Sequence, residues 1–279
     1  MTELSMSDRF LYAARLKSYL GKFEEAEAIL TEGLEQDPDN ATILRNRGHR
    51  RITLRKYDGA LADLTRASEL IAGTQDEHEF YQRDTEPDLV NIILGRMDKV
   101  REQHIPVNAE TIAATKGMYK STLHGSVWYH LGVVKYLTAD FQGSFDDFGR
   151  SQELGVDDDS LVATFDWRYM SLRRLGRTEE AASLLNAFDT SSLTVTAGED
   201  FYLRRLKLYK GESTPEKVLE ELSESFLSLA TQGYGVGNWY LYNGNEEAAR
   251  STFELVVKHG TPNAFAYMAA EAELARMSA

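Results

Sequence analysis

An internal repeat constrains the fold of this chain more than any other sequence feature. Residues 26–30, AEAIL, align with residues 60–64, ALADL, at a spacing of 34. The same spacing relates Phe23 to Tyr57 and Gly33 to Ala67. A structural unit that recurs at a fixed period buries its apolar side against its neighbours, so the repeat predicts a stack of similar units.

Within the repeats, apolar residues follow helical spacing. In residues 26–34 they fall at i, i+3, i+4 and i+8, and residues 60–67 are similar, whereas no convincing run alternates with the period of a strand. Prolines are expected where helices begin or end. The five prolines lie at breaks between the apolar segments: Pro38, Pro87, Pro106, Pro215 and Pro262. The sequence therefore predicts an all-α chain.

Two helices joined by a short turn and repeated every 34 residues resemble the tetratricopeptide repeat (TPR). Its pattern has small residues at positions 8 and 20 and large ones at positions 4 and 24. The best match in this chain, residues 125–158, has Trp128, Leu131 and Gly132 in the first helix and Phe148 in the second. Residues 242–257 are similar to the terminal repeats of bacterial TPR lipoproteins. The resemblance implies a right-handed α-solenoid of TPR-like helix pairs with a C-terminal capping helix.

The resemblance divides the chain into repeats within one expected domain, residues 1–279. The repeats are about 7–40, 41–74, 125–158, 162–195, 197–229 and 230–263, followed by a capping helix at 264–278. Residues 75–124 do not fit the repeat, and in them we expect a helix from Leu89 to about Arg101. Two interpretations stay open: a linker helix or divergent repeat, or an insertion that reaches the concave face or contacts another subunit.

Charge and composition exclude several classes of function. The chain has 44 acidic residues and 31 Lys and Arg, a net charge of -13, which argues against binding nucleic acid or an anionic membrane. The absence of cysteine excludes disulfides, thiolate metal sites and a cysteine nucleophile. There is no apolar run long enough to span a membrane and no signal peptide. We expect a cytoplasmic protein, although a periplasmic chain without its leader would look the same.

Motifs for catalysis or metal binding are lacking. The six histidines form no HExxH motif. Asp157, Asp158 and Asp159 lack the glycine and final glutamate of a calcium loop, so we expect a helix N-cap there. The glycines of residues 233–238 follow no strand and lack the lysine of a phosphate loop. We therefore expect no catalytic residue, no metal and no cofactor.

The TPR resemblance implies that certain positions of each first helix line a concave groove. Aromatic anchors with a few directional donors suit peptide recognition, because they give contact area at a low cost in side-chain entropy. The expected groove residues are Arg15, Arg45, Asn46, His49, Tyr129, His130, Tyr136, Arg173, Arg205 and Asn238.

Residues 41–56 stand out from the acidic average. They contain six positive charges and no acidic residue. Either these cations pair with acidic helices of the same chain, such as the one that begins at residues 24–27, or they form a basic segment of the groove that accepts a carboxylate.

The leading hypothesis is a non-catalytic adaptor or scaffold that binds a peptide or helical segment of another protein, with an acidic segment as a suitable ligand. One alternative is a homo-oligomer, such as a homodimer, assembled through the solenoid or residues 75–124. A second is an enzyme or small-molecule sensor on a helical scaffold, with His124, His130 and Arg173 near one pocket.

Overall fold

The computed structural model describes residues 4–118, 120–190, 201–220 and 226–278, together with Leu193 and Val195. The chain forms two compact units. Unit 1 is Met1–Val134 with Glu153–Val156, and unit 2 is Lys135–Gln152 with Asp157–Ala279. Parts of two expected repeats, residues 197–200 and 221–225 of 197–229 and residues 191, 192 and 194 of 162–195, lie outside the described residues. The extent of a single domain, 1–279, stays a prediction.

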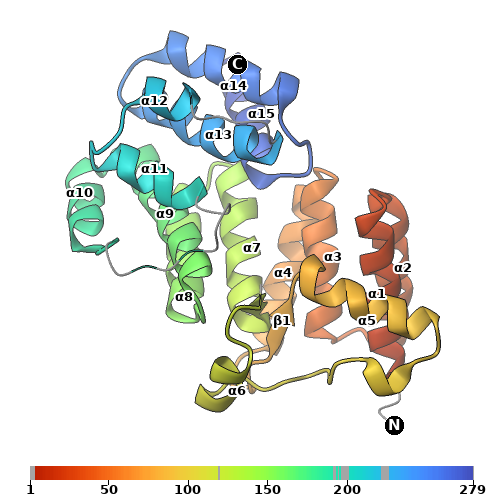
Figure 1. Ribbon diagram of the computed structural model, residues 1–279. Coiled ribbons are helices and arrows are strands. Elements are labelled where there is room, and N and C mark those ends of the chain that lie inside the picture. Colours follow the sequence, from red (N-terminus) through yellow and green to blue (C-terminus); the bar gives the residue numbers. More distant parts are fainter. Residues whose placement is uncertain are drawn as a thin grey trace. The chain divides into compact units, whose positions relative to one another are not determined.

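Unit 1 begins with two helix pairs (Figure 1). The helices are α1 (Met6–Tyr19), α2 (Phe23–Gln36), α3 (Ala41–Thr53) and α4 (Tyr57–Leu70). Each packs on the next, and α1 also contacts α3. Side chains fix where the pairs begin: Ser5 and Asp8 form a capping box at α1, and Asn40 accepts a hydrogen bond from the backbone N–H of Ile43 at α3.

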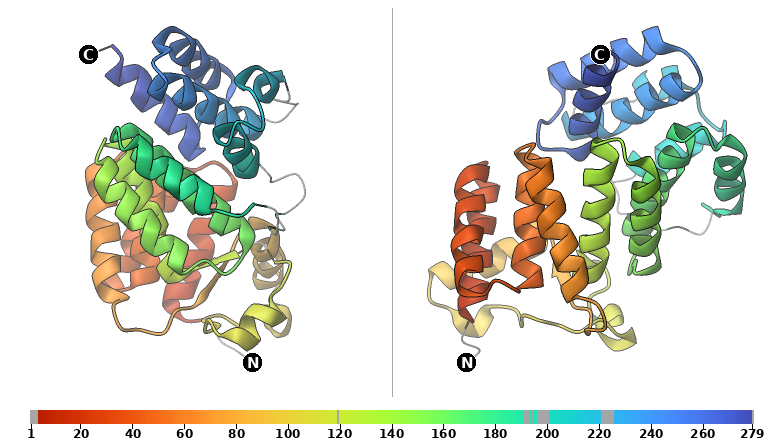
Figure 2. Two further views of the ribbon diagram at one scale, coloured as in Figure 1. Left: turned by 90° about the vertical axis from the view of Figure 1, so that its left-hand side faces the viewer. Right: turned by 180° about the vertical axis from the view of Figure 1, so that it is seen from behind.

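The remainder of unit 1 contains short elements and the start of a long helix. These are β1 (His78–Phe80), α5 (Gln82–Ile93), a 3₁₀ turn η1 (Met97–Lys99), α6 (Ala109–Ala114), β2 (Lys120–Thr122) and α7 (Leu123–Leu137). The strands pair antiparallel, with His78 opposite Thr122. Figures 1 and 2 show that the segment from β1 to η1 lies on the α1 and α3 side of the helix pairs, away from α2 and α4.

Unit 2 continues the succession of helices. They are α8 (Phe141–Glu153), α9 (Asp158–Arg174), α10 (Thr178–Ala187), α11 (Phe201–Tyr209), α12 (Pro215–Glu220), α13 (Phe226–Tyr242), α14 (Glu246–His259) and α15 (Phe265–Arg276). The alternate helices α9, α11, α13 and α15 contact one another in sequence, while α10, α12 and α14 pack on their partners. This is the arrangement of an α-solenoid of TPR-like pairs, as predicted.

Small residues allow the two helices of a pair to approach closely. A Cβ on Gly48 would lie 2.6 Å from the Cγ of Leu64, and one on Gly237 would lie 2.5 Å from Cε1 of Phe253. Ala60, in the position that the repeat pattern gives to alanine, is fully buried. The glycine and alanine positions of the repeat are therefore packing constraints.

The turn between paired helices recurs with the same hydrogen bonds. After Tyr19, for example, the N–H of Gly21 donates to the carbonyl of Ser18, and the N–H of Lys22 donates to that of Lys17, which is a Schellman motif. The residues that adopt a positive φ in these turns are Gly21, Arg55, Gly95, Ala139, Gly176, Gly211 and Gly244. The turn at Gly95 shows that α5 ends like the first helix of a repeat, although only η1 follows it.

In residues 75–124 the expected helix bounds and the break at Pro87 were wrong, and two short strands were missed. The helix expected from Leu89 to Arg101 is α5, which begins at Gln82 and stops at Ile93, because the turn at Gly95 ends it. Pro87 lies inside α5 and marks no break. The three-residue strands were missed, since so short a pair has no detectable alternation. None of the helices in the described ranges is long and apolar enough to cross a membrane.

Candidate functional site

The expected groove residues are divided between the two units. Arg15 on α1, Arg45, Asn46 and His49 on α3, and Tyr129 and His130 on α7 belong to unit 1. Tyr136, Arg173, Arg205 and Asn238 belong to unit 2. We call the side of unit 1 formed by α1, α3 and residues 123–134 of α7 the basic face, and describe it first.

Arg45 is paired with a carboxylate from the segment that covers the basic face. Its Nε donates to Oε1 of Glu79 at 3.1 Å, and its second nitrogen contacts the other carboxylate oxygen. Both side chains are buried, with 6% and 5% of their surface exposed. The basic residues 41–56 suggested a site for a carboxylate ligand. For Arg45 this carboxylate is that of Glu79, on strand β1 of the same chain.

Other cations of residues 41–56 pair with α2 and α4. Arg47 contacts Asp63 at 2.7 Å, and Arg51 contacts both Asp63 at 2.9 Å and Glu27 at 3.0 Å. Lys56 reaches Glu27 at 2.5 Å. The two acids are nearly buried, so each accepts two cations where water is largely excluded. For these residues the internal-pairing interpretation is correct.

Two arginines of the basic face lack such a partner. Among the residues that the structure describes, neither Arg15 nor Arg50 has a carboxylate within ion-pair distance. Arg50 lies over the ring of Phe23, with 5.4 Å from its guanidinium carbon to the ring centre, and Arg15 lies 5.9 Å from the ring centre of Tyr12. Burial lowers the pKa of Arg50 to about 10, which leaves it protonated at neutral pH. We call Arg15, Arg45 and Arg50 the arginine cluster.

Two histidines adjoin the arginine cluster. The rings of His49 and His130 lie 4.5 Å apart, and Nδ1 of His130 lies 2.6 Å from the carbonyl oxygen of Ser126. Burial, reinforced by the charge of Arg45, lowers the pKa of His130 to about 3, and burial and Arg50 lower that of His49 well below its usual value. Both imidazoles are therefore neutral at pH 7, and the positive charge beside them comes from the arginine side chains.

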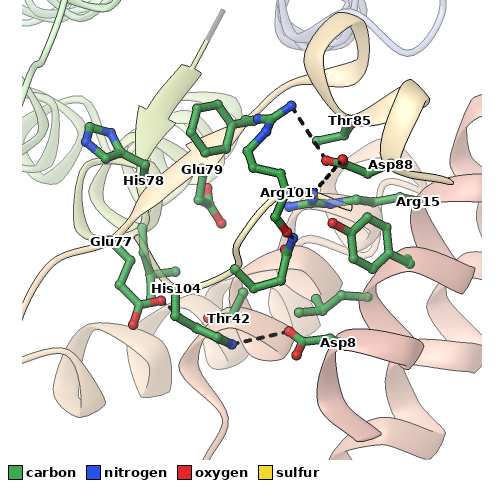
Figure 3. A pocket seen from close by; sticks show the side chains of 15 residues that line it. Asp8, Arg15, Thr42, Glu77, His78, Glu79, Thr85, Asp88, Arg101 and His104 are labelled. Atoms are coloured by element: carbon green, nitrogen blue, oxygen red, sulfur yellow. Dashed lines mark hydrogen bonds and ion pairs between the residues drawn. The ribbon is translucent and has the colours of Figure 1, made fainter. Parts of the chain in front are cut away.

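The covering segment contacts α1 near both ends of that helix, and Figure 3 shows the contact at its N-terminal end. His104 contacts Asp8 at 3.3 Å and Glu77 at 2.8 Å, and these carboxylates raise the pKa of His104 to about 10. At the other end of α1, the hydroxyls of Tyr19 and Thr85 are 2.6 Å apart. These contacts fix residues 76–104 against the basic face and leave Arg15 beside them.

A small polar cavity lies between α1 and the covering segment. Figure 3 shows Asp88 and Arg101 on one side and Glu77 and His104 on the other. Its volume is about 50 Å³, room for a few water molecules and far below that of a small-molecule pocket. The cavity is therefore too small for an organic substrate.

In unit 2, Tyr136 and Asn238 lie inside a cluster of aromatic side chains. The hydroxyl of Tyr234 donates to that of Tyr136 at 2.8 Å, and the amide of Asn238 donates to the same hydroxyl at 3.2 Å. Tyr136 also packs edge-on against Trp167. All are fully buried, so these side chains offer no surface to a partner.

Arg205 is likewise enclosed. It forms an ion pair of 2.8 Å with Asp166, both with no exposed side-chain surface, and its Nε donates to the hydroxyl of Tyr209 at 3.1 Å. Burial raises the pKa of Asp166 to about 6 despite Arg205. A Cβ on Gly235 would lie 2.4 Å from Nε of Arg205, so the glycine makes room for the guanidinium. The pair is part of the core of unit 2.

Among the expected groove residues that lie in unit 2, Arg173 is half-exposed. Its guanidinium donates to Oδ1 of Asn243 and to the hydroxyl of Tyr169, both at 3.1 Å, and lies 4.0 Å from the ring centre of Tyr242. His124, which one hypothesis placed near Arg173, lies in unit 1, with Nε2 at 3.1 Å from the hydroxyl of Thr74.

Sequence reasoning missed two residues of the basic face. Arg50 was seen as part of a basic run but lies outside the groove positions of the repeat pattern. Glu79 lies 34 residues from Arg45 in a segment without repeat, and no local spacing links them.

Comparison with known proteins gives only distant structural likeness. No family model and no curated protein matches the chain. The crystal structure of YrrB, described as a TPR protein with an unusual peptide-binding site, is similar at 16% identity and a TM-score of 0.44, over 95% of this chain and 90% of that one. The APC/C hetero-tetramer Cut9–Hcn1 is similar at 15% identity and a TM-score of 0.34, over 97% of this chain and 42% of that one. Both scores are low, so the fold assignment rests on the helices and turns described above.

Proposed function

We propose that this protein is a non-catalytic scaffold that binds an acidic segment of another protein on the basic face of unit 1. The observation that carries this proposal is the pair Arg15 and Arg50, two arginines without a carboxylate among the described residues, in a chain of net charge -13. Arginine offers planar, bidentate donors that suit a carboxylate.

Side chains around the arginine cluster support a polypeptide ligand. Asn46, Tyr129 and Tyr19 are half-buried, so each keeps part of its surface open to a partner. Tyrosine and arginine are the residues that most often anchor protein interfaces. A segment with acidic and apolar residues would contact both kinds of side chain.

The expected groove residues of unit 1 and of unit 2 have different roles in the proposed function. Arg15, Asn46, His49, Tyr129 and His130 belong to or support the binding surface, and Arg45 organises it through Glu79. Tyr136, Arg205 and Asn238 stabilise the core of unit 2, because they are fully buried. Arg173, which is half-exposed, is the one of the four expected groove residues in unit 2 that keeps surface for a partner.

Site-specific photo-crosslinking tests the proposal. A photoreactive phenylalanine analogue replaces Asn46 on the basic face or, as a matched control, the exposed Ala62 on α4. We expect a crosslinked partner at position 46 but not at 62, and a loss of that product when Arg15 and Arg50 are both changed to Gln. Equal products at the two positions would contradict the binding face, and a product with the mass of two copies of this chain would instead support the homo-oligomer.

A further inference from the structure

The segment of residues 76–104 that covers the basic face is held there mainly by polar side chains. Four of its described polar residues are buried: His78, Glu79, Thr85 and Asp88. Among its described apolar side chains only Leu89 is buried, whereas Val90, Ile93 and Leu94 on α5 are exposed. Apolar burial supplies most of the free energy that holds elements together, so this segment is attached less firmly than the helix pairs that it covers.

The attachment of the segment to α3 is the buried ion pair of Arg45 with Glu79. Nε of Arg45 donates to Oε1 of Glu79 at 3.1 Å, and the two side chains have 6% and 5% of their surface exposed. Such a pair gains little net free energy, because both charges give up their hydration, yet leaving Arg45 without an anion would be costly. Arg45 therefore needs a buried carboxylate, and one from another polypeptide would satisfy it as well as Glu79 does.

Glu79 reaches Arg45 from an extended strand. It is the middle residue of β1 and lies opposite Ser121 of β2. Beside that pair, the N–H of Leu123 donates to the carbonyl of Glu77 at 2.8 Å. A polypeptide that takes the place of β1 is therefore extended as well, and its main chain gains hydrogen bonds to β2, as in the addition of a strand to a sheet.

Two glycines bound the region between α4 and β2 that contains the covering segment. Gly73, after α4, has a φ of 76°, and Gly117, before β2, has a φ of 81°. A Cβ on either glycine would meet no atom within 4 Å. Since glycine adopts positive and negative φ with similar ease, the backbone can change direction at both positions without steric strain. The segment can therefore leave α3 while α4 and β2 stay in place.

We propose that β1 is an internal ligand, and that an extended acidic segment of the partner replaces it, pairing with β2 and placing a carboxylate on Arg45. The inference rests on the proposed function and names the form of the partner segment. A ligand tethered to its own site acts at an effective concentration on the order of millimolar. Glu79 therefore excludes weak acidic ligands, and only a partner with further contacts on the basic face displaces β1.

A peptide copy of β1 tests the inference by fluorescence polarisation. The probe is a labelled peptide with the sequence of residues 74–83, and a second peptide has Gln at the position of Glu79. Full-length Glu79→Gln should bind the first peptide at least about tenfold more tightly than the original chain does, since its own strand supplies no carboxylate to Arg45. The second peptide should bind this variant at least about tenfold more weakly than the first, because it lacks the charged acceptor.

Glu27→Gln is the matched control. It also removes a nearly buried carboxylate, one that pairs with Arg51 of α3 from α2, and it should bind both peptides as the original chain does. Equal affinity of the original chain and Glu79→Gln for the first peptide would overturn the inference. So would equally tight binding by both variants, because a general loosening of unit 1 would then be the cause.

Hydrogen exchange in the original chain tests the replacement directly and does not depend on a variant. The chain is isotope-labelled, so that fragments of its own β1 differ in mass from the peptide. At a saturating concentration of the first peptide, the amides of β1 (His78–Phe80) should exchange faster, while those of α14 (Glu246–His259) should not change. Unchanged or slower exchange in β1 would contradict the replacement.

The same measurement separates the inference from the proposed function. A partner captured at position 46 should also speed exchange in β1. A partner that loses affinity when Arg15 and Arg50 are both changed to Gln, but leaves exchange in β1 as it was, would support binding on the basic face and overturn the replacement of β1 alone.

Discussion

Arg45 on α3 and Glu79 on β1 form a buried ion pair that joins the first two helix pairs to the segment covering them. Through this pair, the segment of residues 75–124 contributes a side chain to the basic face. It also gives Arg45 a carboxylate partner that Arg15 and Arg50 lack among the described residues.

Removing one member of this pair should destabilise unit 1. Glu79→Gln leaves the guanidinium of Arg45 buried without an anion, which costs about 3 kcal/mol. Urea unfolding followed by circular dichroism measures the change. The double variant Arg45→Met/Glu79→Leu removes both charges and should recover more than half of the loss. A double variant as unstable as the sum of the single variants would contradict the coupling.

Stability should fall in mild acid because of His130. Its pKa is about 3 in the native state, below the value of 6.5 for a free side chain. The unfolded chain therefore binds a proton that the native chain does not, and stability is lost as the pH falls from about 6.5 toward 3. In His130→Gln the urea midpoint should change less between pH 7 and pH 4.5 than in the original chain. His259→Gln, at an exposed position, should leave the pH dependence as it is.

His104 should act in the opposite direction. Its carboxylate partners raise its native pKa to about 10, so its contribution is fully present below about pH 6.5 and is lost as the pH rises toward 10. Since its side chain is 54% exposed, solvent screening limits the contribution to about 1 kcal/mol. His104→Gln should be less stable than the original chain at pH 6 and equal to it at pH 10.5. A deficit that persists at pH 10.5 would indicate lost packing instead.

The close helix contact at Gly48 predicts a sensitive position. Gly48→Ala places a methyl group 2.6 Å from the Cγ of Leu64, and overpacking of this kind costs about 1–3 kcal/mol. Thermal unfolding measures it. Gly149→Ala on α8 is the control, because its Cβ would lie 3.5 Å from the nearest atom and alanine favours a helix. If both variants melted alike, close packing would not be the reason for glycine at 48.

The sequence allowed the helix pairs to be predicted, because their signals are local. Ala26 and Ala60 are fully buried as their repeat positions require, and the turns at Gly21 and Arg55 recur at the same spacing. Asp157 caps α9 as expected. The end of α5 follows from a local turn at Gly95 that the expected helix overran. The pairing of Arg45 with Glu79 was not predictable, since it depends on a contact between distant residues. The same limit applied to Arg205, whose burial depends on Asp166 and Gly235.

Binding of an acidic segment on the basic face is tested most sharply by the affinity of the partner captured at position 46. The crosslinked segment of that partner is titrated calorimetrically into three proteins. These are the original chain, the variant with both Arg15 and Arg50 changed to Gln, and the control variant Arg66→Gln on α4. We expect at least about a tenfold loss of affinity for the double variant and no loss for Arg66→Gln. Equal affinity for all three proteins would contradict a binding site at the arginine cluster.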